Sequence, residues 1–510
     1  MKKTLIWMVG LMLLYGVSPG QTADNTRLEI YQVKVGEGHS TLIVTKSTDA
    51  TPVIYKSVLI DAGKGSKDAT LIAQLINDPN VANGQLDVVM VTHHDQDHWG
   101  GLPGTGGLLR KRCLTGGSLK AANPNRLKLY MSIRDGNLPT SNRMRENNLN
   151  NTFNPNGEDN LVIRHWERDL DIRLLPRSCT SFDISIHTLA INGFRRDGGG
   201  RIPLDGNANN VVKNKNSAIA TVVWGEFSFL LQGDMYSAGT EGKITRTTTD
   251  YRRAEDNRRF PTTWSGGTVQ NAITSTRNNS TYSSADFIRL NNSTANQSFA
   301  ASTAVEFPSQ LDNYAHWVAN PARWHHELGQ TINDYNGTID EYGYACVALV
   351  PHHGALSSSH WFKTSHAIIG SNKNNNNGHP NIKAISSLYN TTGATNFYIT
   401  YLLDNQVYSG TTINRLTEMR ELLNYNYAAQ AGEPQGGGYL PDAKVFYLDG
   451  GTSADAADNL RGPVGPEGTA NLSYIKLIVR DGREFRIETD LRNSSSPEGP
   501  LRDWGLCEGR

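Results

Sequence analysis

Apolar and polar residues alternate in short blocks near the start of the chain, and the blocks predict strands. The segment RLEIYQVKVGEGHSTLIV predicts two strands around a glycine-bounded turn, and SVLIDAG predicts another buried strand that ends at Asp61. The segment DATLIAQLIND places its leucines and isoleucines on one helical face and stops before Pro79. The apolar run LDVVMV then leads to His93. This order predicts an α/β layer whose polar site lies at the carboxyl ends of its strands.

Two long segments further along have a sparser apolar pattern. Residues from about 114 to 211 mix strand-like runs with loops rich in Asn and Gly, and residues from about 237 to 336 are rich in Ser, Thr and Asn. We interpret both as loop-rich insertions in one framework that extends over residues 21–510, with an independent second domain as the alternative. Near the end, YIKLIVRDGREFRIE predicts a hairpin that turns at Asp481 and Gly482.

The first twenty residues have the layout of a secretory signal peptide. Lys2 and Lys3 precede the apolar run TLIWMVGLMLLYGV, and small residues follow in SPGQ. A membrane anchor is the alternative, but the apolar run is shorter than the roughly 20 residues that span a bilayer. We therefore expect residues 1–20 to be removed, and a secreted or periplasmic protein with no membrane attachment after cleavage.

Charge and cysteine content exclude some classes of protein. Lys plus Arg number 49 and Asp plus Glu number 49, so no overall charge attracts the chain to nucleic acid or to an anionic membrane. The four cysteines are far apart, without the C-x-x-C spacing of a zinc ribbon. In an oxidising compartment they allow up to two disulfides in three alternative pairings.

The segment VTHHDQDHWGGL carries the densest chemistry of the chain. In extended backbone, residues two apart point the same way, so His93 and Asp95 can share one ion. A turn then directs Asp97 and His98 to a second position, while His94 points elsewhere. A polar loop without metal is the alternative, but so many potential ligands in six residues would repel one another and lose solvation without a cation.

This segment resembles the metallo-β-lactamase superfamily signature T-H-x-H-x-D-H-x-G-G, with Asp95 at the second histidine position. The H-x-D-x-D-H form is similar to the metallo-hydrolase domain of ComEC-type competence proteins. Four further blocks match in order: LIDAG, NKNSAIATVVWGEFSFLLQGDM, VALVPHHGALSSS and AIIGSNKNNNNGHPNIKAISSL. The resemblance implies an α/β fold, a metallo-β-lactamase-like αββα sandwich, with the two insertions between the blocks.

The resemblance also implies roles for single residues. Asp61 braces the metal loop, Asp234 bridges two ions, and His353 is a ligand with His352 as its neighbour. His379 stands before Pro380 in the last block and would donate to a phosphate oxygen or act as a general acid.

The chain departs from the branch pattern in two places. Where the branch has D-V-G-Q-G-D, this chain has Lys34, Glu37 and His39 at the first, fourth and sixth positions. The superfamily's mid-chain histidine has no evident counterpart: Asn214 occupies the aligned place, and His187, on an alternating strand, is more often a packed core residue. One metal position is therefore expected to be short of a protein ligand.

The implied cofactor is two divalent metal ions, with zinc or manganese expected and iron also compatible. His93, Asp95 and His353 would favour one ion and Asp97 and His98 the other, and an activated water would attack an ester. An aspartate in place of a histidine shifts the preference from zinc towards harder ions.

Three functions fit these residues. The first is a secreted metal-dependent phosphodiesterase or nuclease, the second is a lactonase or β-lactamase, and the third is a surface-binding protein with a structural metal site. For an enzyme we expect a small-molecule or nucleic-acid ester as substrate. The candidate catalytic residues are Asp97, His352 and His379; the candidate metal ligands are His93, Asp95, Asp97, His98, Asp234 and His353; Asp61 and Asn214 are further candidates.

Overall fold

The computed structural model describes the framework of the chain in segments. These are residues 25–36, 38–114, 117–119, 126–132, 144–154, 160–175, 184–191, 194–195, 217–234, 343–355, 362–371, 379–380, 385, 388, 394–402, 406–408, 411–413, 443–448, 460–461, 474–489 and 504–507. The expected signal peptide, the expected insertion at about 237–336 and Asn214 lie outside these residues.

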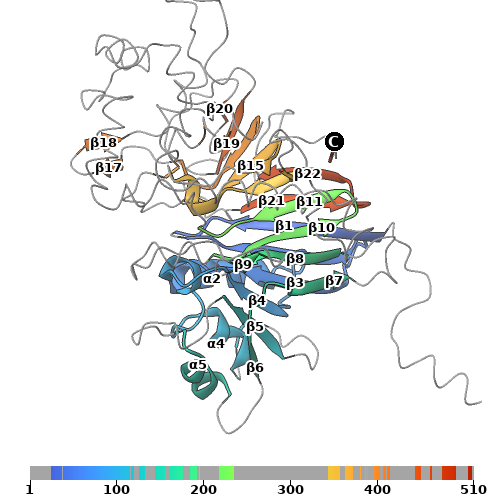
Figure 1. Ribbon diagram of the computed structural model, residues 1–510. Helices are drawn as coiled ribbons and strands as arrows, with labels where there is room; N and C mark the ends of the chain where they lie inside the picture. Colours follow the sequence, from blue (N-terminus) through green and yellow to red (C-terminus); the bar gives the residue numbers. More distant parts are fainter. Residues whose placement is uncertain are drawn as a thin grey trace, which may run out of the picture.

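One large sheet has nine strands (Figure 1). Their order is β23 (Gly505–Leu506), β22 (Glu484–Thr489), β21 (Tyr474–Arg480), β1 (Thr26–Val33), β2 (Thr41–Ser47), β3 (Ile54–Ile60), β4 (Val88–Val91), β5 (Leu127–Met131) and β6 (Leu161–His165). Pairing is antiparallel from β23 to β3 and parallel from β3 to β6.

The second large sheet has ten strands. Their order is β20 (Leu460–Arg461), β19 (Lys444–Tyr447), β16 (Asn396–Ile399), β15 (His366–Ile369), β13 (Val347–Leu349), β11 (Phe227–Leu231), β10 (Ile219–Trp224), β8 (Ile184–Ile191) and β7 (Asp171–Leu175), with β9 (Phe194–Arg195) paired to β8. Two small ribbons pair β12 (Gly343–Tyr344) with β14 (Phe362–Lys363) and β17 (Gln406–Tyr408) with β18 (Thr411–Ile413).

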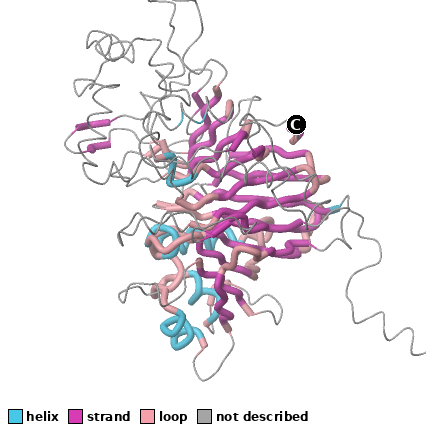
Figure 2. Tube along the Cα trace, viewed as in Figure 1, coloured by secondary structure: helices cyan, strands magenta, loops and turns pink. Residues whose placement is uncertain are grey.

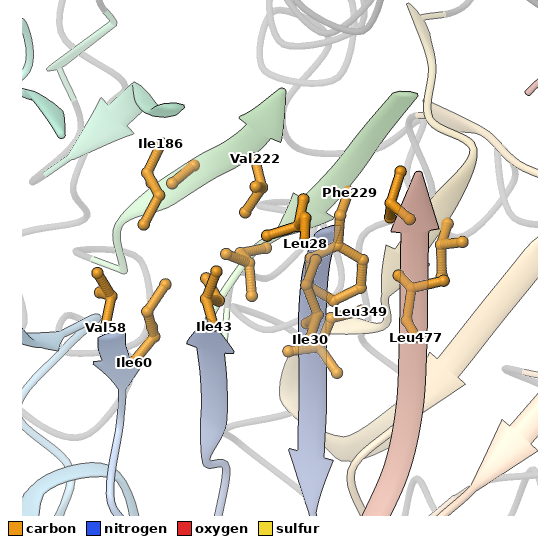
Figure 3. Close-up of a cluster of buried hydrophobic side chains, with 14 of the residues drawn as sticks. Leu28, Ile30, Ile43, Val58, Ile60, Ile186, Val222, Phe229, Leu349 and Leu477 are labelled. Carbon is orange, nitrogen blue, oxygen red and sulfur yellow. The ribbon is translucent and has the colours of Figure 1, made fainter. Parts of the chain in front are cut away.

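The two large sheets pack face to face through apolar side chains. Leu28 and Ile30 of β1 and Ile43 of β2 lie opposite Val222 and Phe229 of the other sheet (Figure 3). Each of these five side chains is at most 1% exposed. Burial of this apolar surface is the main force that holds the sheets together.

The other face of the nine-stranded sheet is covered by α2 (Ser66–Asn77), α4 (Leu108–Cys113) and α5 (Glu146–Phe153). The predicted helix before Pro79 is α2, and it buries Ile72, Leu75 and Ile76 as expected. The predicted hairpin is β21 and β22, with Asp481 and Gly482 at positive φ in its turn.

The fold class predicted from the sequence is confirmed: the protein is a mixed α/β sandwich of two sheets. Strands dominate the described residues and helix is sparse (Figure 2). Part of the segment from about 114 to 211 supplies framework strands, because β5 and β6 extend one sheet and β7 and β8 the other. The described part of this segment is thus less loop-like than its composition indicates.

One disulfide joins Cys346, immediately before β13, to Cys507, immediately after β23. This disulfide therefore links the two large sheets. The sequence alone leaves three cysteine pairings open, and this pairing is one of them. Cys113 is free and buried, and Cys179 lies outside the described residues. Within the described segments, no helix is long and apolar enough to span a bilayer.

Candidate metal centre

The polar residues of the site follow strand ends in both large sheets. Asp61 follows β3, His93 follows β4, and Asp234 follows β11. His352 and His353 follow β13, which is parallel to β11. Because these strands end at one edge of the sandwich, side chains far apart in sequence meet there, as the α/β pattern predicted.

The short helix α3 (Gln96–Trp99) holds the ligands that follow β4. Asp95 is its N-cap residue, and Asp97 and His98 lie within it. Gly100 ends this helix where two backbone segments lie close together. Gly100 has an ordinary helical φ of -59°, but a Cβ atom there would lie 1.9 Å from the Lys64 carbonyl oxygen. Glycine is needed here because the backbones approach closely.

The 3-10 turn η5 (Pro351–Gly354) carries the two adjacent histidines in a strained backbone. His352 has φ 49° and His353 has φ 55°, both in the left-handed region that branched and bulky residues avoid. Gly233, which precedes Asp234, accepts a hydrogen bond from the His352 amide at 3.1 Å. Strained backbone of this kind is characteristic of functional sites.

Four residues form one compact group of potential ligands: Asp97, His98, Asp234 and His353. Their ligand atoms all lie within 4.8 Å of one another. Oδ1 of Asp234 is 3.1 Å from Nε2 of His98 and 3.7 Å from Nε2 of His353, which is also 3.4 Å from Oδ2 of Asp97. Two imidazoles and two carboxylates at these separations suit a divalent ion.

A second set of atoms surrounds the other oxygen of Asp234. Oδ2 of Asp234 lies 3.7 Å from Nε2 of His93 and 4.0 Å from Nε2 of His352. Nε2 of His93 is also 3.8 Å from Oδ2 of Asp95. The sequence predicts that His353 shares an ion with His93 and Asp95, but the structure places His353 with Asp97 and His98. Alternation along the strand could not reveal this, because η5 comes from the other sheet.

Buried ligand atoms without hydrogen bonds show that these residues fit metal ions. Nε2 of His93, His98 and His353 and Oδ1 of Asp234 are buried and form no hydrogen bond of ordinary geometry. A buried polar atom without a well-formed hydrogen bond costs about 1–3 kcal/mol. Divalent cations in the two ligand sets would satisfy these atoms, so the donors fit the two ions that the resemblance implied.

Hydrogen bonds behind the ligands fix the imidazole rings. Asp61 accepts from Nδ1 of His98 at 2.8 Å and also from the amide and hydroxyl of Thr92 at 2.8 and 2.7 Å. Nδ1 of His353 donates to the carbonyl of Gly370 at 2.8 Å. In each histidine the other ring nitrogen, Nε2, is thereby left to face the ligand group. This is the usual support of a metal-bound histidine.

Burial and neighbouring charge shift the protonation of the metal-free site in different directions. Burial lowers the pKa of His93 well below its ordinary value, and His98 lowers it further. Burial also opposes protonation of His98, but Asp234, Asp61 and Asp97 outweigh it and raise the pKa of His98 well above the ordinary value. Burial raises the pKa of Asp234, but His98 and the other histidines outweigh it and hold that pKa well below its usual range. A metal ion must therefore displace protons from this site.

The remaining candidates fall into different places. His379 is only 4% exposed and its ring centroid lies 5.4 Å from that of His352, so it borders the site and is not a histidine in solvent. His187 lies on β8 and pairs with Asp171 at 2.8 Å, outside the ligand group. Asn214 falls in a segment that is not described.

His39 borders the site but is absent from the candidate residues that the sequence predicts. Its ring centroid lies 4.2 Å from that of His353 and 5.3 Å from that of His98, and it is 1% exposed. Burial lowers its pKa well below the ordinary value, so it is a neutral ring against two ligands. The available signal was its place in VKVGEGHS, where the resembling branch has an aspartate.

No family model and no curated protein sequence matches the chain. Solved structures give weak matches. A metallo-β-lactamase from Cronobacter sakazakii with a mutated HARLDQ motif is 14% identical with a TM-score of 0.22, and the match covers 45% of this chain and 73% of that one. A long-form RNase Z from yeast is 12% identical with a TM-score of 0.24, over 46% and 32% of the two chains. Unliganded yeast PDE1 is 10% identical with a TM-score of 0.23, over 41% and 65%.

The chain therefore spans about a third of the yeast RNase Z and just under two thirds of PDE1. Likeness at this level carries no argument about the reaction.

Proposed function

We propose that this protein is a secreted, metal-dependent hydrolase that acts on phosphodiesters. The observation that carries the proposal is the convergence of buried imidazole nitrogens and carboxylate oxygens on Asp234, whose two oxygens face two different sets of ligands. Closed structural zinc sites are typically built from cysteine and histidine alone, whereas two-metal hydrolytic sites commonly bridge their ions with a carboxylate and keep a coordination position for water.

Two divalent ions, when bound, would supply an activated water and stabilise the charge that develops on the attacked ester. The residues of the chain have separate tasks. Asp97 and Asp95 are partly exposed, with side chains 28% and 22% accessible, so the ligand set opens to solvent on the carboxylate side. The histidine ligands are buried and rigidly supported. A substrate would therefore approach from the side of the two aspartates.

The preference for phosphodiesters rests on the sequence resemblance and on His379. This buried ring lies beside the two histidines of η5, with its centroid 5.4 Å from that of His352 and 6.2 Å from that of His353. An imidazole held there could donate a proton or a hydrogen bond to a phosphate oxygen. A lactonase or β-lactamase remains the second candidate, because the ligand set would activate water for those substrates equally well.

Metal content together with a substrate screen tests the proposal. Purified protein is expected to carry up to two divalent ions by elemental analysis, and Asp97→Ala and Asp234→Ala are expected to lose most of one or both. The protein should hydrolyse a model phosphodiester faster than a chromogenic cephalosporin or a lactone, with manganese at least as effective as zinc.

Each other outcome assigns a different function. Rapid cephalosporin or lactone hydrolysis without phosphodiester hydrolysis would replace the proposal with the second candidate. Bound metal without turnover of any ester would indicate the surface-binding protein. Equal metal content in the wild type and both variants would remove the metal centre itself.

A further inference from the structure

Asp234 divides the histidines of the site into two pairs. Oδ1 faces His98 at 3.1 Å and His353 at 3.7 Å, whereas Oδ2 faces His93 at 3.7 Å and His352 at 4.0 Å. Each pair has its own aspartate: Asp97 lies 3.4 Å from His353, and Asp95 lies 3.8 Å from His93. Each oxygen of the Asp234 carboxylate therefore faces two histidines and one further aspartate.

The backbone of η5 makes this division possible. Adjacent residues in an extended strand point in opposite directions, and in a regular helix they diverge by about 100°. Here His352 and His353 both have left-handed φ values, and their ring centroids are 6.1 Å apart with the planes inclined by 57°. Both Nε2 atoms consequently reach the same carboxylate, one at each oxygen.

We propose that His352 is a metal ligand, and that it completes the ion position formed by His93, Asp95 and Oδ2 of Asp234. The proposal rests on the dinuclear centre of the proposed function, and it gives His352 a role other than the catalytic one expected from the sequence. Ligand atoms about 2.1 Å from one ion lie about 3–4 Å apart, which matches the separations on this side of Asp234.

This assignment supplies the ligand that the sequence left missing. The position around His93 would otherwise have one imidazole and two carboxylates from the described residues. With His352 it has two imidazoles and two carboxylates, which is also the donor set of Asp97, His98, Asp234 and His353. The His352–His353 dipeptide would thus give one imidazole to each ion. Matching donor sets further predict that both positions take the same metal with similar affinity.

Metal stoichiometry of two matched variants tests the proposal. Asparagine tolerates the left-handed backbone at both positions, so His352→Asn and His353→Asn remove an imidazole with little added strain. Each variant is expected to bind one ion where the wild type binds two, with the affinity for the lost ion reduced at least about 100-fold. Titration of the chelated protein with manganese or zinc alone measures this, without any substrate.

Controls separate the possible results. His187→Gln removes a histidine outside the site and should still bind two ions. Thermal unfolding in chelator should be similar for the wild type and His352→Asn, which shows that the fold survives. His352→Asp restores an anionic ligand and should recover the second ion in part.

Two ions bound to His352→Asn with wild-type affinity would overturn the proposal and return His352 to a catalytic role. A wild-type protein that binds only one ion would also overturn it. A wild-type protein that binds two ions but hydrolyses no ester would refute the proposed function and leave the ligand assignment standing. Failure of the two proposals is therefore distinguishable.

Discussion

Replacement of Asp61 by asparagine should weaken metal binding while the fold is kept. Asp61 is 2% exposed, does not belong to either ligand set, and accepts hydrogen bonds from His98 and from the amide and hydroxyl of Thr92. Asparagine has the same shape and tolerates the φ of 59° at this position. One of its terminal atoms, however, is a donor. If that donor faces Nδ1 of His98, the imidazole must carry its proton on Nε2, the atom that faces Asp234.

The size of the effect follows from these contacts. A partner that fixes the tautomer of a metal-bound histidine changes metal affinity by about 10–100-fold, so Asp61→Asn should bind metal that much more weakly. Asp61→Ala removes all three acceptor contacts and leaves buried donors unpaired. Hydrogen bonds to a charged group contribute about 1.5–3 kcal/mol each, and because they are not additive we expect a loss of about 3–5 kcal/mol in the free energy of unfolding.

Two measurements check these values. Competition with a chelator of known affinity gives the metal dissociation constant of each variant, and urea unfolding of the metal-free protein gives its stability. Asp49→Asn, in the turn after β2, serves as a control that changes charge equally outside the site. Wild-type metal affinity in Asp61→Asn, or wild-type stability in Asp61→Ala, would refute the bracing role.

Three further outcomes are expected. Gly38→Ala should lose at least about 2 kcal/mol in the free energy of urea unfolding, because Gly38 has φ 96° and a Cβ there would lie 1.5 Å from the Asp97 carbonyl oxygen. Gly104→Ala is the control and should change stability little, because the space around Gly104 is open. Equal stabilities of the two variants would contradict the close approach at Gly38. Burial lowers the pKa of His366 to about 4, so the unfolded chain takes up a proton below pH 6.5 that the folded chain does not. His366 alone should therefore lower the free energy of unfolding by about 2 kcal/mol between pH 7 and pH 5. Paired urea titrations of the wild type and His366→Phe should differ by that amount. His379→Ala should keep its metal and lose at least about 100-fold in phosphodiester turnover, and loss of metal with activity would instead make it a ligand.

Short-range pattern was sufficient to predict the elements that build the site. Alternation and turn residues predicted β1 to β4, α2 and the β21–β22 hairpin, because a strand or helix that buries one face must repeat its apolar residues with the period of that structure. The crowding of His93, Asp95, Asp97 and His98 predicted a cation, because such a concentration of donors is unfavourable without one.

Sequence pattern failed where the outcome depended on packing between distant segments. It grouped His353 with His93, although η5 turns His353 towards Asp97 and His98. It did not select among the cysteine pairings, because the choice of Cys346 with Cys507 depends on where β13 and β23 meet across the sandwich.

The sequence by itself determined which residue types could bind an ion, and at which strand ends they lie. Only the tertiary structure decided which oxygen of Asp234 each histidine faces, and that His39 packs against His98 and His353. The physical reason is that a ligand set is defined by distances of a few ångströms between side chains from different sheets. Those distances are fixed by the face-to-face packing of the sheets and by the left-handed turn at His352 and His353, neither of which has a local period in the sequence.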